Sequence, residues 1–178
     1  MRLTVTIREM DRMADRVGVE AIDTSFETST IYDLVVDARG IELALRTLET
    51  PLVKRYPIDD AFAHWASWDT AWVAEEDGVI VGFAAVEHAA WHARIVLWHF
   101  YVDLARRRGG IARQLIDRVE AHARSKGATH VWLETSNVNV PGIAAYARLG
   151  YELCGVDRMF YEATGVAHEQ AIFLAKRL

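Results

Sequence analysis

The sequence predicts a single α/β domain over residues 1–178, with a long antiparallel section ahead of a strand–helix–strand–helix unit. Three observations predict this class. Apolar and polar residues alternate with the period of β-strands through much of the first hundred residues. An Asp-Gly pair at 77–78 joins two such runs in the way a tight hairpin turn does. The clearest amphipathic helix comes only afterwards, at residues 110–126.

The front half is expected to be mainly β. The predicted strands cover residues 3–7, 41–48, 71–75, 79–91 and 94–102, and the predicted short helices cover 8–17 and 60–69. Residues 25–32, rich in Thr, Ser and Ile, fit neither period. Thr50-Pro51 and Tyr56-Pro57 predict a loop, because a residue before proline avoids helical angles.

The second half is expected to alternate helix and strand. Ile111, Leu115, Ile116 and Val119 share one face of the 110–126 helix, and Gly127 ends it. A strand at 130–134 and a helix at 141–149, stopped by Gly150, come next. The closing strands are predicted at 151–154 and 170–174.

Composition excludes several classes of function. The net charge of −5 argues against a general nucleic-acid binder, which carries a basic surface. Cys154 is the single cysteine, so neither a disulfide framework nor a multi-cysteine metal site is expected. His88 and His92 are four residues apart in a strand-and-turn segment, where that spacing does not converge on a metal. The sequence shows no signal peptide and no membrane-length apolar run, and we expect a cytoplasmic protein.

The strongest local signal is the run from Tyr101 to Ala112, which follows a strand and opens the best helix. Its glycines let backbone N–H groups approach an anion, and the helix N-terminus adds partial positive charge. Three consecutive arginines, 106–108, add cationic charge. A solvated basic run before a glycine-rich helix start is the alternative reading. Neither the Gly-x-Gly-x-x-Gly dinucleotide spacing nor a Walker Gly-Lys-Ser/Thr is present.

A second constellation, residues 133–151, combines a strand end, a polar loop and a short helix with a tyrosine near its middle. Asn137 and Asn139 can each donate and accept hydrogen bonds, which suits an amide-bearing ligand. Tyr146 could donate a proton to a departing thiolate. The alternative is a capping asparagine and a tyrosine packed in the core.

Together the two segments resemble the GNAT acetyltransferases. Arg107-Arg108-Gly109-Gly110-Ile111-Ala112 is similar to the motif with which that family holds the acetyl-CoA pyrophosphate. Asn139, Tyr146, Gly150 and Tyr151 resemble the family's second motif, whose Asn contacts the CoA arm and whose Tyr lies beside the sulfur. The resemblance implies the GNAT fold: a mixed, mostly antiparallel central sheet of about six to seven strands flanked by helices. It also implies an acetyl-CoA-binding core at about residues 70–155, acetyl-CoA as co-substrate and no metal. The implied coenzyme contacts include strand residues Phe100, Tyr101 and Val102.

Several further segments resemble the streptothricin (nourseothricin) acetyltransferases in particular. These segments are residues 25–32, 50–57, 82–86, 133–141 and 154–171. That subfamily is understood to acetylate an amine of the antibiotic's β-lysine side chain, so the resemblance implies a small-molecule amine substrate and an antibiotic-resistance role. Homodimers are frequent among relatives, and both a homodimer and a monomer stay open.

One departure concerns the general base. Relatives tend to carry carboxylates on the strand before the phosphate turn, whereas Leu97–Val102 has none. His99 is the evident substitute, although a lone histidine in an aromatic strand is more often a packed residue. Glu134, at the end of the neighbouring strand, is the other candidate. A peptide- or protein-amine acetyltransferase and a non-catalytic acetyl-CoA-binding domain are the alternative functions.

Overall fold

The computed structural model describes residues 4–178, which divide into two compact units. Of these residues, the first unit comprises 4–25, 55–132 and 177–178, and the second comprises 26–54 and 133–176. The strand β7 (His130–Ser136) begins in the first unit and ends in the second. Each unit contains one part of the predicted site.

The first unit is built on antiparallel strands β1 (Val5–Glu9), β4 (Thr70–Glu76), β5 (Val79–Ala89) and β6 (Arg94–Val102). Their hydrogen-bonded order is β1-β4-β5-β6-β7, with β7 parallel to β6. The order then continues β7-β9-β8 in the second unit, giving seven strands. The expected mixed, mostly antiparallel sheet is therefore confirmed.

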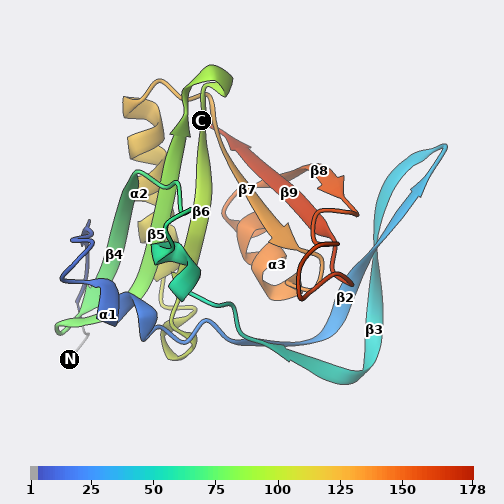
Figure 1. Ribbon diagram of the computed structural model, residues 1–178, viewed down its shortest axis with the longest axis horizontal. Helices are drawn as coiled ribbons and strands as arrows, with labels where there is room; N and C mark the ends of the chain where they lie inside the picture. Colours follow the sequence, from blue (N-terminus) through green and yellow to red (C-terminus); the bar gives the residue numbers. More distant parts are fainter. Residues whose placement is uncertain (1–3) are drawn as a thin grey trace. The chain divides into compact units, whose positions relative to one another are not determined.

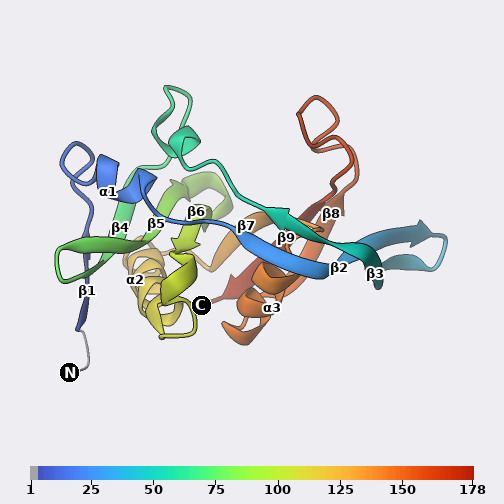
Figure 2. The ribbon, with the colours of Figure 1, turned by 90° about the horizontal axis from the view of Figure 1, so that it is seen from below.

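Two helices cover opposite faces of these strands (Figures 1 and 2). The helix α2 (Ile111–Ser125) packs on β5, where a Cβ on Gly82 would lie 3.1 Å from Leu115. On the other face, α1 (Arg16–Glu20) contributes Val19 to a buried cluster with Phe83 and Ala85 of β5. Successive side chains of a strand point to opposite faces of the sheet, so β5 contributes to a core on each face.

The second unit contains a long hairpin of β2 (Phe26–Asp37) and β3 (Gly40–Lys54), visible as a twisted arm in Figure 1. It also contains α3 (Val140–Arg148) and the antiparallel pair β8 (Glu152–Asp157) and β9 (Ala171–Arg177). The first unit also contains short 3₁₀ turns at Asp59–Phe62, Ala90–His92 and Leu104–Arg106.

Most predicted elements are confirmed within a few residues, including the hairpin turn at Asp77-Gly78, where φ is 50° and 80°. The predicted 8–17 helix is wrong. The β1 strand continues through Arg8, which pairs in register with Val73 of β4, and the helix begins only at Arg16. The Arg8 guanidinium also binds the Asp15 carboxylate at 2.7 Å, which holds the preceding turn in place.

The predicted loop at Thr50-Pro51 is also wrong, since β3 runs through it. The β2–β3 register shifts here: Thr28 pairs with Leu52, but Thr30 pairs with Thr47. Pro51 therefore lies in a bulge, where its missing N–H interrupts no ladder bond. The unassigned 25–32 segment is mostly strand β2, and the predicted 60–69 helix is reduced to the 3₁₀ turn at Asp59–Phe62.

Candidate active site

The turn between β6 and α2 has the backbone shape that the phosphate-binding prediction requires. Arg108 and Gly110 adopt left-handed angles, with φ of 65° and 86°. Gly110 is the N-cap of α2 and has no side chain to bond the first-turn N–H groups, and that turn contains no acidic residue. The first N–H groups of a helix have no partner inside it, so this helix end can bind an anion.

Polar contacts fix the entry to this turn. The Asp103 carboxylate accepts hydrogen bonds from the backbone N–H groups of Ala105 and Asp23, both at 3.0 Å. Arg107 donates from Nε to the carbonyl of Val102 at 3.0 Å and is partly buried. Burial lowers the pKa of the Arg107 guanidinium below its ordinary value, while nearby Asp23 and Asp103 oppose that change. The turn is therefore held in shape by its own residues and by the backbone of Asp23.

The three arginines of the turn differ in their surroundings. Arg106 is paired with Glu76 at 2.6 Å, so much of its charge is offset. Arg108 is exposed at the turn, next to Gly109, and Arg107 is anchored at the strand end. All three arginines are expected to add cationic charge at this turn. Arg107 and Arg108 do so more than Arg106, whose charge is offset by Glu76.

The strand β6 leads into the turn and carries the predicted contacts Phe100, Tyr101 and Val102, all partly exposed. Its parallel ladder with β7 joins Arg94–Val96 to His130–Trp132. Beyond that ladder, β6 is bonded to β5 on one side, and alternate N–H groups point to the other side as in any strand. Such groups can bind an amide-bearing ligand. Ile111 and Ala112, the other predicted contacts, form the start of α2.

His99 lies in the core of β6. It is 7% exposed, and its ring is stacked 6.1 Å from the ring of Phe83. Burial lowers the pKa of the imidazole to about 4, so the ring is neutral at pH 7. A general base works best with a pKa near the operating pH, and these surroundings favour a packing role for His99.

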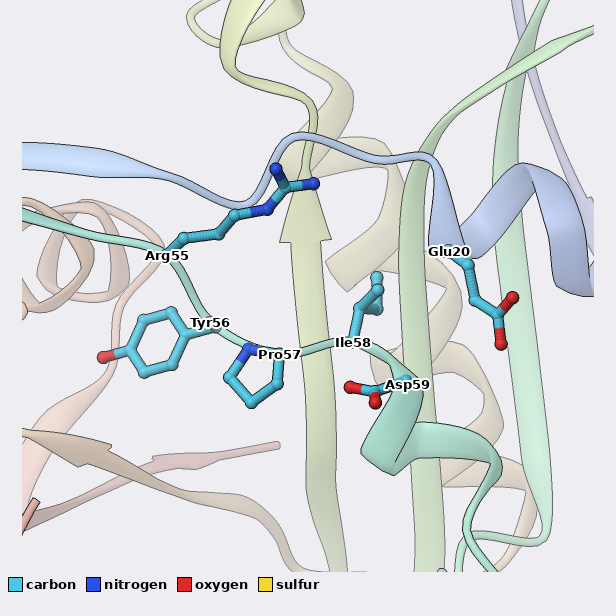
Figure 3. Close-up of a pocket in the computed structure, with 6 residues that line it drawn as sticks. All are labelled: Glu20, Arg55, Tyr56, Pro57, Ile58 and Asp59. Carbon is cyan, nitrogen blue, oxygen red and sulfur yellow. The ribbon is translucent and has the colours of Figure 1, made fainter. Parts of the chain in front are cut away.

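A pocket of about 450 Å³ opens in the first unit (Figure 3). Glu20 and Asp59 bring carboxylates to it, and Arg55 lies at the other end in the view. The Tyr56 ring, which also lines the pocket, lies 6.4 Å from the ring of Tyr101 on β6. Glu20 and Asp59 are 39 positions apart, and no local sequence pattern indicates that their carboxylates line one pocket.

In the second unit, the two asparagines have separate structural roles. The Asn137 side chain, 4% exposed, donates to the Tyr32 carbonyl at 2.7 Å and accepts from the Gln170 N–H at 2.8 Å. It therefore joins β2 to the start of β9 and is not placed to bind a ligand amide. Asn139 caps α3 by accepting from the Gly142 N–H at 3.1 Å, and its Nδ2 donates to Thr135. Its contact with the CoA arm stays a prediction.

Tyr146 and Glu134 interact electrostatically in the second unit. Burial is the main cause that raises the pKa of the Tyr146 phenol above its ordinary value, and the Glu134 carboxylate raises it further. Burial likewise raises the pKa of Glu134, although a hydrogen bond donated by the Tyr161 hydroxyl opposes the rise. Tyr146 therefore stays protonated at neutral pH and can donate a proton. Tyr161 was missed in the sequence, because no periodicity links residue 161 to residue 134.

Two absences concern the described residues 4–178 only. No group of three or more His, Cys, Asp or Glu side chains there is arranged to hold a metal ion. No helix there is long and apolar enough to cross a membrane.

Comparison with known proteins identifies the family of this chain. The sequence model of the Acetyltransferase (GNAT) family matches residues 41–151. The chain is 36% identical to a streptothricin acetyltransferase of Streptomyces lavendulae over 92% of this chain and 90% of that protein. A streptothricin acetyltransferase of Escherichia coli is 27% identical over 85% of this chain and 84% of its own length.

Solved structures show the same fold. A nourseothricin acetyltransferase superposes with a TM-score of 0.87 at 32% identity, covering 97% of this chain and 98% of that one. A Bacillus anthracis protein in complex with acetyl coenzyme A superposes with a TM-score of 0.82 at 22% identity, covering 98% and 100% of the two chains. The family match covers more than half of the sequence, and acetyl-CoA is the family's co-substrate. This chain therefore belongs to the acetyltransferase (GNAT) family of acetyl-CoA-dependent N-acetyltransferases.

Proposed function

We propose that this enzyme transfers the acetyl group of acetyl-CoA to a primary amine of a streptothricin-type antibiotic. The observation that carries the proposal is the extent of the likeness. The general family model covers residues 41–151, whereas the likeness to the streptothricin acetyltransferase covers 92% of the chain. An acetylated amine loses its positive charge, and the reaction would alter the recognition of a cationic antibiotic.

The phosphate turn is proposed to bind the coenzyme diphosphate. In support, Arg108 and Gly110 adopt left-handed angles, and the first turn of α2 presents N–H groups that no side chain caps. Arg107 and Arg108 add cationic charge at the same end of the helix. A diphosphate is therefore met by backbone donors, by the helix dipole and by two guanidinium groups.

Glu134 is proposed as the general base, and Tyr146 as the proton donor to the departing thiolate. A carboxylate with a raised pKa is a better base than one exposed to water, and Glu134 has such a pKa because of its burial. Tyr146 retains its proton because burial disfavours the phenolate. His99, the remaining candidate, is neutral but buried among aromatic rings.

The end of the first-unit pocket that carries Glu20 and Asp59, opposite Arg55, is proposed to attract the cationic acceptor. Strand β6 has no carboxylate between Leu97 and Val102, but Glu20 and Asp59 supply two in the adjoining pocket. They come from α1 and from the segment after β3, so the missing acidic strand residues have a substitute elsewhere in the chain.

A cytoplasmic location and a homodimer are proposed from the family alone.

Release of free thiol from acetyl-CoA tests the proposed function. Purified protein is mixed with acetyl-CoA and nourseothricin, with a lysine-containing peptide or with no acceptor. Thiol release with the antibiotic, and the acetylated antibiotic in the mass spectrum, is the expected result. Turnover of the peptide alone would favour a peptide acetyltransferase, and coenzyme binding without any turnover would favour a non-catalytic domain. Either result would contradict the proposal.

A further inference from the structure

Four side chains of the second unit interact with the Glu134 carboxylate, and one of them, Tyr146, belongs to the predicted site. Tyr161, from the segment between β8 and β9, donates its hydroxyl hydrogen to Glu134 Oε1. Lys54 at the end of β3 and Glu169 just before β9 act on it electrostatically with opposite signs. The charge of Glu134 raises the pKa of the Tyr146 phenol on α3. The four groups come from three parts of the chain: β3, α3 and the segment between β8 and β9.

Lys54 and Glu169 form a buried ion pair. Lys54 Nζ lies 2.5 Å from Glu169 Oε2, and the two side chains are 15% and 4% exposed. A pair this deeply buried is screened little by solvent, and its two partners act on the Glu134 carboxylate in opposite directions. Breaking an exposed pair would have little effect, but changing this one alters the potential at Glu134.

The backbone around the cluster is fixed by hydrogen bonds. The Tyr161 carbonyl accepts from the Thr164 N–H at 2.9 Å and from the Thr164 hydroxyl at 2.7 Å. Glu169 donates its N–H to the Val166 carbonyl at 2.8 Å. Its neighbour Gln170 exchanges hydrogen bonds with Asn137. Asn137 therefore helps to set the position of Glu169. Its side-chain amide is hydrogen-bonded within the protein for this reason.

We propose that Tyr161 is a positioning residue for acetyl transfer, which holds one oxygen of Glu134 while the Lys54–Glu169 pair sets the charge around it. The proposal rests on the function given above, in which Glu134 takes the proton of the acceptor ammonium. The phenol of Tyr161 stabilises the ionised carboxylate through its hydrogen bond. The carboxylate of Glu169 disfavours that ionised form, and the ammonium of Lys54 favours it.

The pH profile of kcat/KM for the acceptor tests this arrangement. Tyr161→Phe removes the bond that lowers the pKa of Glu134, so the acidic limb of the profile should move to higher pH. A shift of about one unit would reduce kcat/KM roughly tenfold on that limb and leave the plateau less affected. The KM for acetyl-CoA should change little. Glu169→Gln removes a repelling charge and should move the same limb to lower pH.

The opposite directions distinguish positioning from general damage, because a distorted site would not shift the limb upward in one variant and downward in the other. Tyr32→Phe removes a phenol outside the cluster and is the matched control, with an expected wild-type profile. Tyr161→Phe preserves the ring, and the test therefore stands even if Glu169→Gln does not fold. A limb that stays in place in Tyr161→Phe would overturn the proposal.

A second measurement separates this inference from the proposed function. The Glu134 carboxyl can be titrated by ¹³C NMR in the coenzyme-free protein, with its signal identified by its loss in Glu134→Gln. A higher titration midpoint in Tyr161→Phe supports the proposed role of Tyr161 even if the antibiotic is not the acceptor. An unchanged midpoint refutes it even if the wild type acetylates nourseothricin.

Discussion

A carboxylate placed at Gly110 should abolish most coenzyme affinity while leaving the fold intact. Gly110 has a φ of 86°, and a Cβ built on it meets nothing within 4 Å. Gly110→Glu therefore causes no clash, and its conformational cost is about 1–2 kcal/mol for a left-handed residue. The new side chain lies at the N-terminus of α2, where the diphosphate is proposed to bind.

The electrostatic cost to binding can be estimated by Coulomb's law. A carboxylate about 7 Å from a diphosphate of charge about −2 is repelled by about 2.4 kcal/mol at an effective dielectric constant of about 40. That energy corresponds to a roughly 50-fold increase in Kd. Gly110→Ala carries the backbone strain without the charge and should change Kd by only a few-fold.

Isothermal titration calorimetry with CoA at about 0.15 M salt measures the effect, and thermal melting checks that each variant is folded. Gly127→Glu is the matched control. Gly127 also has a positive φ, 70°, with nothing within 4 Å of its Cβ. It lies 17 residues further on, about 25 Å along α2, well beyond the Debye length of about 8 Å. An unchanged Kd in Gly110→Glu, or an equal loss in Gly127→Glu, would refute the placement of the diphosphate.

Three further predictions concern Tyr146, His99 and the cap of α3. Tyr146→Phe should lower kcat at least tenfold while leaving the Kd of CoA unchanged, as measured by steady-state kinetics and calorimetry; equal turnover would remove the phenol from the mechanism. Because the pKa of His99 falls from 6.5 unfolded to about 4 folded, the unfolded chain binds the proton first as pH falls. Stability should therefore be lost between pH 6.5 and 4, by up to about 3 kcal/mol, and denaturant melts of His99→Leu should show a smaller loss over that window. Asn139→Ala should cost about 1 kcal/mol of stability by removing the cap. Gly142→Ala should cost at least as much, because its Cβ would lie 2.3 Å from the Asn139 side chain; melting temperatures at the wild-type level in both variants would contradict the cap.

Much of the fold could be predicted from local pattern. The hairpin around Asp77-Gly78, strand β6 and helix α2 have periodicities that their own residues set, and burial in the structure follows those periodicities. In the mispredicted 8–17 segment, Arg8 and Glu9 belong to a strand that pairs with β4, and the turn that follows is held by the ion pair of Arg8 with Asp15. The pairing with β4 involves residues more than sixty positions away, which no local window contains.

The sequence by itself determined the turn between β6 and α2, because left-handed backbone at Gly110 and a helix start after it depend on adjacent residues. It also determined the cap of α3, since Asn139 and Gly142 are three residues apart. Only the tertiary structure decided the surroundings of the two candidate bases. His99 is surrounded by rings from β5 and β6, and Glu134 is joined by Tyr161, Lys54 and Glu169. The physical reason is that a pKa depends on burial and on neighbouring charges, and those neighbours come from strands and loops distant in the chain.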